Sequence, residues 1–181
     1  NEVLVFLNHI FIQEPSPPTP IPEEVKIMRG LFYVHLYGAF EKSINELVQK
    51  TILLVDSKNV KHRHYSMPFN SIALINKLKS LKGSGHGKLI SKAVELFEEI
   101  NCLREPSLNE TAFARDLQNV WTKTISTVND SFGIKNFIIS TRERATIDEL
   151  VENRNKIAHG RERPTVVGST HMANQLKDKL D

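Results

Sequence analysis

The chain has 181 residues, of which 40% are hydrophobic and 25% are charged. These are ordinary globular values, so they exclude a wholly disordered chain and are sufficient for one domain with a real core. The formal net charge is only +3, which permits a polyanionic partner without demanding one. A dedicated duplex-DNA binder usually has a stronger basic patch.

The number of cysteines and the hydropathy of the chain indicate the cellular compartment of the protein. Cys102 is the single cysteine, so no disulfide forms within the chain, which fits a reducing environment. No apolar run reaches the roughly 18 residues that a membrane-spanning helix needs. Residues 1–13 lack the basic region and the cleavage site of a signal peptide. We therefore expect a cytoplasmic protein without a membrane partner.

The N-terminal region divides into an arm and a linker. Residues 3–12 are apolar and partly β-branched, and they are compatible with a short strand or with a docking arm. Residues 14–22 hold five of the chain's 8 prolines, which predicts an extended linker because proline fixes φ and removes a donor. The expected division is an N-terminal arm and Pro-rich linker over residues 1–22 and a helical domain over residues 23–181.

A long helix is predicted from Glu23 to about Val55, because no proline interrupts it and acids stand at its N-terminus. Its apolar side chains recur at helical spacing in a broad stripe. They are Tyr33, Leu36, Tyr37, Phe40, Ile44, Leu47, Val48 and Leu54. A stripe this wide indicates more than one neighbouring element.

Further helices are predicted along the rest of the chain. Apolar periodicity indicates a short helix from Pro68 through Leu78, another over residues 90–100 and a third from Phe113 to Val128 that ends before Gly133. Two more follow: one from Thr141 to His159, and a last one that Ser169 or Thr170 caps and that carries Met172, Leu176 and Leu180. The predicted fold class is all-α, a bundle of about five or six helices with one long N-terminal helix.

Arg154 is out of place in the helix over residues 141–159. Ile147, Leu150 and Val151 mark the apolar side of this helix, and Arg154 falls in the middle of that side. A buried guanidinium is costly unless it is paired and hydrogen-bonded. Arg154 is therefore expected to have an acidic partner, an anionic ligand or a subunit interface over it.

Asn155 and His159 are one helical turn apart, so Asn155 is placed to orient the His159 ring. The helix dipole at this end favours the imidazolium form, and Gly160 lets the chain leave abruptly. The alternative interpretation is an ordinary helix end with a solvated Asn and His. Capping does not explain Arg154, however, and this residue favours a functional site.

The segment Arg154-Asn-Lys-Ile-Ala-His-Gly160 resembles the arginine-to-histidine motif of the HEPN superfamily, in its Arg-Asn-x-x-x-His form. The stretch Leu36-Tyr-Gly-Ala-Phe-Glu-Lys-Ser-Ile-Asn-Glu-Leu47 is similar to HEPN proteins of the RiboL-PSP-like group. In that group an acidic residue of a long helix lies near the Arg and the His. The resemblance therefore implies that Glu41 is the partner of Arg154.

The resemblance also implies a homodimer with a composite site and RNA cleavage without metal or cofactor, in a toxin or anti-phage defence setting. His159 would be the general acid or base, Arg154 would bind the scissile phosphate, Asn155 would position His159 or substrate, and Glu41 would orient Arg154. Some HEPN toxins have a Tyr two residues after the His, which a partner enzyme modifies. This chain has Arg161 at that position, which argues against regulation by modification of a tyrosine. Regulation by an antitoxin or by another partner stays an open alternative.

Lys156, Arg161 and Arg163 flank the motif and are candidates for holding the RNA backbone. A solvated charged rim is an equally good interpretation of each. Two other functions stay open for the whole chain: a non-catalytic HEPN-like module that binds RNA, nucleotide or a protein partner, and a helical assembly module with no nucleic-acid role.

Two further motifs carry less weight. The glycine turn at residues 82–89 lacks the first glycine and the Ser/Thr of a phosphate-binding loop. His62 and His64 would be metal ligands only with further clustered donors. We therefore expect no ATP site and no metal site.

Overall fold

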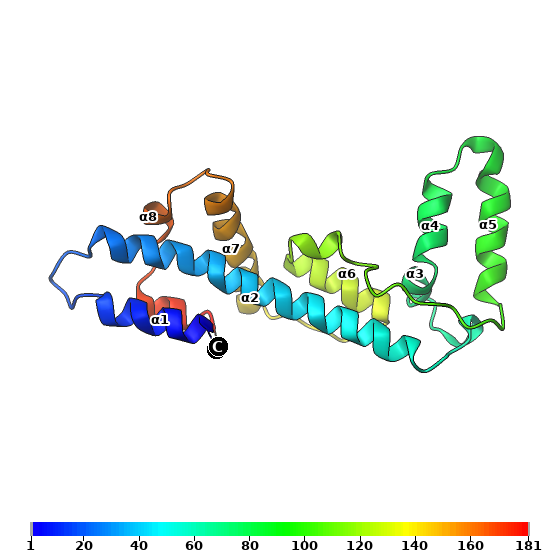
Figure 1. Cartoon of the computed structure of the whole chain (residues 1–181), viewed down its shortest axis with the longest axis horizontal. Helices are drawn as coiled ribbons and strands as arrows, with labels where there is room; N and C mark the ends of the chain where they lie inside the picture. The colour runs from blue at the N-terminus through cyan, green and yellow to red at the C-terminus, as the bar shows by residue number, and fades with distance from the viewer. Residues whose placement is uncertain (1, 181) are drawn as a thin grey trace. The chain divides into compact units, whose positions relative to one another are not determined.

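The computed structural model describes residues 2–180, and it is all-helical over that range, without a strand. The six longer helices are α1 (Glu2–Gln13), α2 (Glu23–Asp56), α4 (Ile75–Lys82), α5 (His86–Ile100), α6 (Thr122–Phe132) and α7 (Thr141–Ala158) (Figure 1). The short ones are α3 (Asn70–Ala73), α8 (Pro164–Val167) and α9 (Ala173–Lys177), with 3-10 turns at His62–His64 and Asp116–Gln118. The predicted all-α class with one long N-terminal helix is confirmed.

The helices form two compact units. Unit 1 consists of Asn1–Ser43 and Ile139–Asp181, and unit 2 consists of Ile44–Ile138. Helix α2 contributes residues to both. The boundary predicted at residue 22 stays a prediction, and the two units are a separate finding.

Helix α1 replaces the strand that the sequence left open for residues 3–12. Val3, Leu7 and Ile10 are buried, and their spacing of four and three residues is that of a helix face rather than of alternating strand residues. This face packs against α9, where Ala173 and Leu176 are buried. The strand alternative is therefore wrong. A short apolar run does not distinguish the two structures by itself.

In unit 1, helix α2 supplies the largest share of the core. Its buried apolar side chains there are Val25, Phe32, Tyr33, Leu36 and Tyr37. Arg29 is buried among them, with 1% of its side chain exposed, and its Nη2 lies 2.7 Å from Oε2 of Glu14. The same carboxylate oxygen accepts the backbone N–H of Ala173 at 3.0 Å, so one acid joins the linker after α1, helix α2 and the start of α9.

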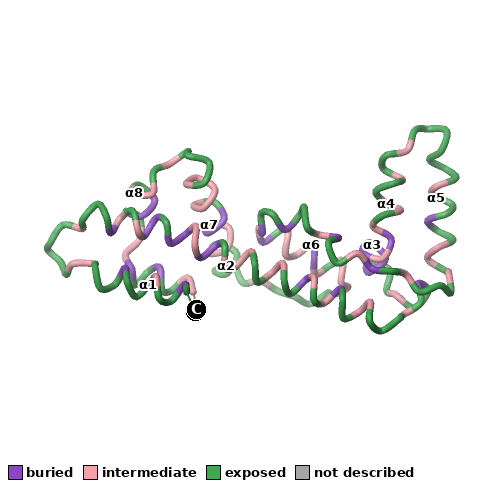
Figure 2. The backbone as a smooth tube through the Cα atoms, in the orientation of Figure 1, coloured by how far each residue is buried: buried purple, intermediate pink, exposed green. Residues whose placement is uncertain are grey.

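In unit 2, the apolar stripe predicted along α2 is only partly buried. Val48 and Ile52 are buried, whereas Leu47 and Leu54 are 62% and 60% exposed. The predicted stripe was therefore too wide, because Leu47 and Leu54 lie outside the covered side of this part of α2. Along this part the helix contains exposed as well as buried residues (Figure 2).

The predicted helices of unit 2 begin and break at different residues from those expected. The helix expected from Pro68 to Leu78 is divided at Leu74, between α3 and α4. The helix expected from Phe113 starts only at Thr122, because the preceding residues form turns and a 3-10 segment. Gly133 ends α6 with φ 78°, the left-handed conformation that favours glycine at this position. Helices α4 and α5 pack together, with Leu96 as the buried residue of α5.

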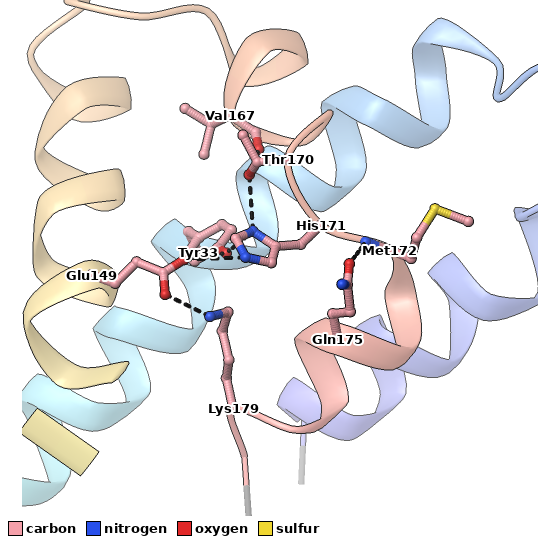
Figure 3. Close-up of polar contacts among 8 residues, drawn as sticks. All are labelled: Tyr33, Glu149, Val167, Thr170, His171, Met172, Gln175 and Lys179. Atoms are coloured by element: carbon pink, nitrogen blue, oxygen red, sulfur yellow. Dashed lines mark hydrogen bonds and ion pairs between the residues drawn. The ribbon is translucent and has the colours of Figure 1, made fainter. Parts of the chain in front are cut away.

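The last helix, α9, has a different N-terminal cap from the one that the sequence predicted. Helix α9 begins at Ala173, and the N–H of Met172 donates to Oε1 of Gln175 at 2.8 Å (Figure 3). The predicted caps, Ser169 and Thr170, are therefore wrong: each hydroxyl instead donates to a carbonyl of the preceding turn.

None of the helices within residues 2–180 has the length and apolar character needed to cross a bilayer.

Candidate functional site

Both ends of α7 are fixed by local contacts. At its start, the Ser140 hydroxyl accepts the N–H of Glu143 and the Glu143 carboxylate accepts the N–H of Ser140, which is a capping box. This reciprocal contact lowers the pKa of the Glu143 carboxyl, through its hydrogen bonds to Ser140. The start of the helix that carries the motif is thus set by its own sequence.

At the other end, α7 closes in a Schellman motif. Gly160 has φ 65°, its N–H donates to the Ile157 carbonyl at 3.0 Å, and the Arg161 N–H donates to the Lys156 carbonyl at 2.8 Å. His159 is the last residue before this turn and is exposed. The motif therefore fixes the backbone from which the His159 ring projects, while leaving the ring open to solvent.

The side chain of Arg154 extends from α7 toward α2, where it contacts Glu41 and Tyr37, and it also contacts the neighbouring Asn155. Its Nη2 is 3.5 Å from Oε2 of Glu41, its Nη1 donates to Oδ1 of Asn155 at 2.7 Å, and its Cζ is 3.9 Å from the centroid of the Tyr37 ring. Its side chain is 15% exposed. A guanidinium so held offers a planar fork of donors, which suits phosphate oxygens.

The structure thus brings together three of the four predicted catalytic residues: Arg154, Asn155 and Glu41. The acid expected beside Arg154 is present, although 30% of its side chain is exposed, so solvent weakens this pair. The amide oxygen of Asn155 contacts Arg154, a neighbour that the sequence did not predict for it. His159 stands five residues after Arg154, at the exposed C-terminal end of α7. The catalytic roles of all four stay predictions.

The flanking cations differ in their surroundings. Lys156 lies 3.3 Å from Glu152 and 3.6 Å from Glu162, and Glu152 first, then Glu162, raises the pKa of its ammonium group. Its charge is therefore balanced locally, which leaves less of it for an RNA backbone. Arg161 and Arg163 are exposed, and their predicted role in RNA binding stays a prediction.

A second polar cluster joins α7 to α2 and to the segment before α9 (Figure 3). The Tyr33 hydroxyl donates to Oε1 of Glu149 at 3.2 Å and lies 2.9 Å from Nδ1 of His171. Lys179 binds the other oxygen of Glu149 at 2.7 Å. Burial, and then the charge of Glu149, raises the pKa of Tyr33, while burial and Lys179 lower the pKa of His171. The cluster therefore holds α7 against α2, and the Tyr33 phenol within it stays neutral.

Tyr33 and Tyr37 are among the residues that the sequence did not assign to the site. They stand one turn apart on α2, and Tyr37 is one turn before Glu41. The available signal was this spacing, since residues four apart share a helix face. Pairing them with Arg154 and Glu149 required knowledge of how α7 packs.

The fold and the site together define a class. An all-α chain, in which a helix ends in Arg-Asn-x-x-x-His and an acid of a long helix pairs with the Arg, is a member of the HEPN superfamily. More narrowly, the family model described as RiboL-PSP-HEPN matches residues 5–180, and the chain belongs to that family. HEPN membership indicates an RNase or an RNA-binding module. Neither the curated proteins nor the solved structures gave a match.

Proposed function

We propose that this protein is a metal-independent endoribonuclease whose active site is completed by a second copy of the chain. The observation that carries the proposal is the Arg154 guanidinium, held 3.5 Å from Glu41 and bonded to Asn155 at the end of the helix that leads to His159. An oriented arginine and an exposed histidine near the same end of one helix are groups that cleavage of a phosphodiester uses.

The reaction uses a nucleophile that RNA itself supplies. The 2′-oxygen attacks the adjacent phosphorus while a base removes its proton, the bond from phosphorus to the 5′-oxygen breaks, and an acid protonates that 5′-oxygen. The products are a 2′,3′-cyclic phosphate and a 5′-hydroxyl. Arg154 would stabilise the charge that accumulates on the non-bridging oxygens.

A second copy is part of the proposal because one chain supplies one motif histidine for two proton transfers. Imidazole titrates near neutral pH and serves as either acid or base. Two copies facing each other across a two-fold axis would supply two His159 rings and two Arg154 side chains. Glu41 would orient Arg154 in each copy without transferring protons.

The setting we propose is a cytoplasmic toxin or anti-phage defence system, in which an antitoxin or another regulatory partner restrains the nuclease. The single cysteine of the chain suits a reducing compartment. Arg161 stands at the position of the tyrosine that some HEPN toxins carry, so the restraint would come from binding rather than from modification at this residue.

The test is cleavage of single-stranded RNA in EDTA, with the 3′ ends of the products analysed. We expect a 2′,3′-cyclic phosphate from the parent protein and almost no cleavage by His159→Ala. His9→Ala is the matched control, because His9 is an exposed histidine of the same unit. Equal cleavage by His159→Ala and the parent would refute the assignment. RNA binding without turnover by a dimer would favour the non-catalytic module instead.

A further inference from the structure

The ring of Tyr37 is a part of the Arg154 site to which the proposed reaction gives no role. Tyr37 is on α2, one turn before Glu41, and only 1% of it is exposed. The Cζ atom of Arg154 lies over this ring, 3.9 Å from its centroid. This distance is well inside the roughly 6 Å within which a cation and an aromatic face attract each other.

The short distance constrains the plane of the guanidinium. With Cζ at 3.9 Å from the centroid, no guanidinium nitrogen can point straight at the ring without a clash, so the ring face limits how far the planar group tilts. The ring therefore restricts a movement that hydrogen bonds within the plane do not restrict.

Two acceptors further restrain the orientation of the same guanidinium. Glu41 lies beside Nη2 at 3.5 Å and Asn155 accepts from Nη1 at 2.7 Å. An ammonium group would be satisfied by the acceptors alone, since it is a compact charge with no plane to define. A ring face combined with two acceptors therefore suits a planar guanidinium held in one orientation better than it suits an ammonium group.

We propose that Tyr37 is a positioning residue for this reaction: its ring face sets the plane of the Arg154 guanidinium, so that the donor edge meets the non-bridging oxygens of the scissile phosphate. This inference rests on the proposed function for its consequence in catalysis, whereas the restraint on Arg154 does not. Catalytic groups must be held close to their productive geometry, and small displacements reduce the rate strongly.

Two substitutions separate the ring from the hydroxyl. Tyr37→Phe keeps the ring face and removes the hydroxyl, whereas Tyr37→Leu removes the ring and keeps an apolar side chain. Phe32→Leu is the matched control for loss of a buried ring: Phe32 is on the same helix, is fully buried and has its ring contact with Phe6. Each variant is compared at a temperature at which it is folded.

The first measurement is the NMR spectrum of the Arg154 side chain, which requires no RNA. The ring current of Tyr37 shifts the δ-methylene protons of Arg154 upfield, and this shift is expected to persist in Tyr37→Phe and in Phe32→Leu and to vanish in Tyr37→Leu. Arg154 signals that stay unchanged in Tyr37→Leu would overturn the proposal.

The second measurement is RNA cleavage at varied substrate concentration. We expect kcat of Tyr37→Leu to fall about tenfold, with KM changed less, because the misdirected group is used in the transition state. Tyr37→Phe and Phe32→Leu should stay near the parent. A loss in Tyr37→Phe as large as that in Tyr37→Leu, or an equal loss in Phe32→Leu, would reject the role of the ring. A parent protein that does not cleave RNA would refute the proposed function, while the NMR shift would still decide the restraint on Arg154.

Discussion

The Nη2 atom of Arg154 lies 3.5 Å from the Oε2 atom of Glu41, and this ion pair joins the motif helix α7 to the long helix α2. Both side chains keep some contact with solvent, at 15% and 30% exposure. The pair is therefore a weak source of stability. Its importance is in the direction that it gives to the guanidinium.

Removing the charge of Glu41 should affect cleavage more than folding. In Glu41→Gln the amide holds Arg154 less firmly, so we expect a fall in kcat of about tenfold and a loss of stability below about 1 kcal/mol. Glu46→Gln is the control, because Glu46 pairs with Lys50 on the surface of the same helix. Steady-state cleavage and urea unfolding test both expectations. A variant that cleaves as fast as the parent would show that Arg154 does not need Glu41.

Gly160→Ala should strain the turn that carries His159. The residue has φ 65°, and a side chain in this conformation costs roughly 1–2 kcal/mol. Relief of the strain would unwind the turn and displace His159, so both the unfolding free energy and the cleavage rate should fall. Gly87→Ala provides the comparison, since Gly87 has ordinary φ and open space around it. Calorimetry and the cleavage assay are sufficient, and unchanged stability in Gly160→Ala would contradict the assigned turn.

Gly168→Ala should damage the packing of unit 1. An added Cβ would overlap the carbonyl of Lys26 and the backbone nitrogen of Gly30 on α2, where no flexible side chain can give way. Overpacking of this kind costs typically about 1–3 kcal/mol. Gly38→Ala on α2 meets open space, and should be neutral or stabilising by up to about 1 kcal/mol through helix propensity. If chemical unfolding ranks the two variants in the opposite order, α8 does not approach α2 this closely.

Arg29→Met should be among the most destabilising single changes in unit 1. It leaves the Glu14 carboxylate, which is 12% exposed, without its guanidinium partner. Breaking one side of a buried pair costs about 3–5 kcal/mol. The double variant Arg29→Met/Glu14→Gln removes both charges and should recover a large part of that loss. Urea unfolding of both variants tests this, and equal stability of the two would mean that the charge of Glu14 is not the source of the cost.

Stability should fall at alkaline pH because of Tyr33. Burial and Glu149 raise the folded-state pKa of Tyr33 above its ordinary value near 10. Above pH 10 the unfolded chain loses the phenolic proton while the folded chain keeps it, so folding becomes less favourable as pH rises. Tyr33→Phe should flatten this part of the profile. Thermal unfolding between pH 8 and 11 measures it, and parallel profiles for the two proteins would refute the assignment. Tyr65, whose pKa is also raised by burial, would keep its own contribution in both.

The sequence was most informative where one helix was long and had one apolar side. The starts of α2 at Glu23 and of α7 at Thr141 are those that the sequence predicted, whereas the Ser140 cap of α7 is seen only in the structure. The sequence was least informative for short apolar runs. Residues 3–12 were compatible with a short strand or a docking arm, and the structure shows a helix that packs against α9 with Val3, Leu7 and Ile10 buried.

Within the site, sequence indicated the anomalous residue but not its full surroundings. Arg154 on an apolar face was expected to have an acidic partner, an anionic ligand or a subunit interface over it, and the acid Glu41 is there. The stacking on Tyr37 and the bond from Arg154 to Asn155 depend on which rotamers the packed helices allow. Apolar periodicity also misplaced the start of α6, because Phe113 and Leu117 are packed from turns and a 3-10 segment rather than from an α-helix.

Unit 1 is assembled from two segments that are far apart in the sequence, and this has a consequence for biosynthesis. Glu14 holds Ala173 across 159 residues, and Arg29 reaches the Gly168 carbonyl across 139. On the ribosome the first helices emerge long before the segments that cover them. The pair of Arg154 and Glu41 therefore cannot form until helix α7 has also left the exit tunnel, long after helix α2 has emerged.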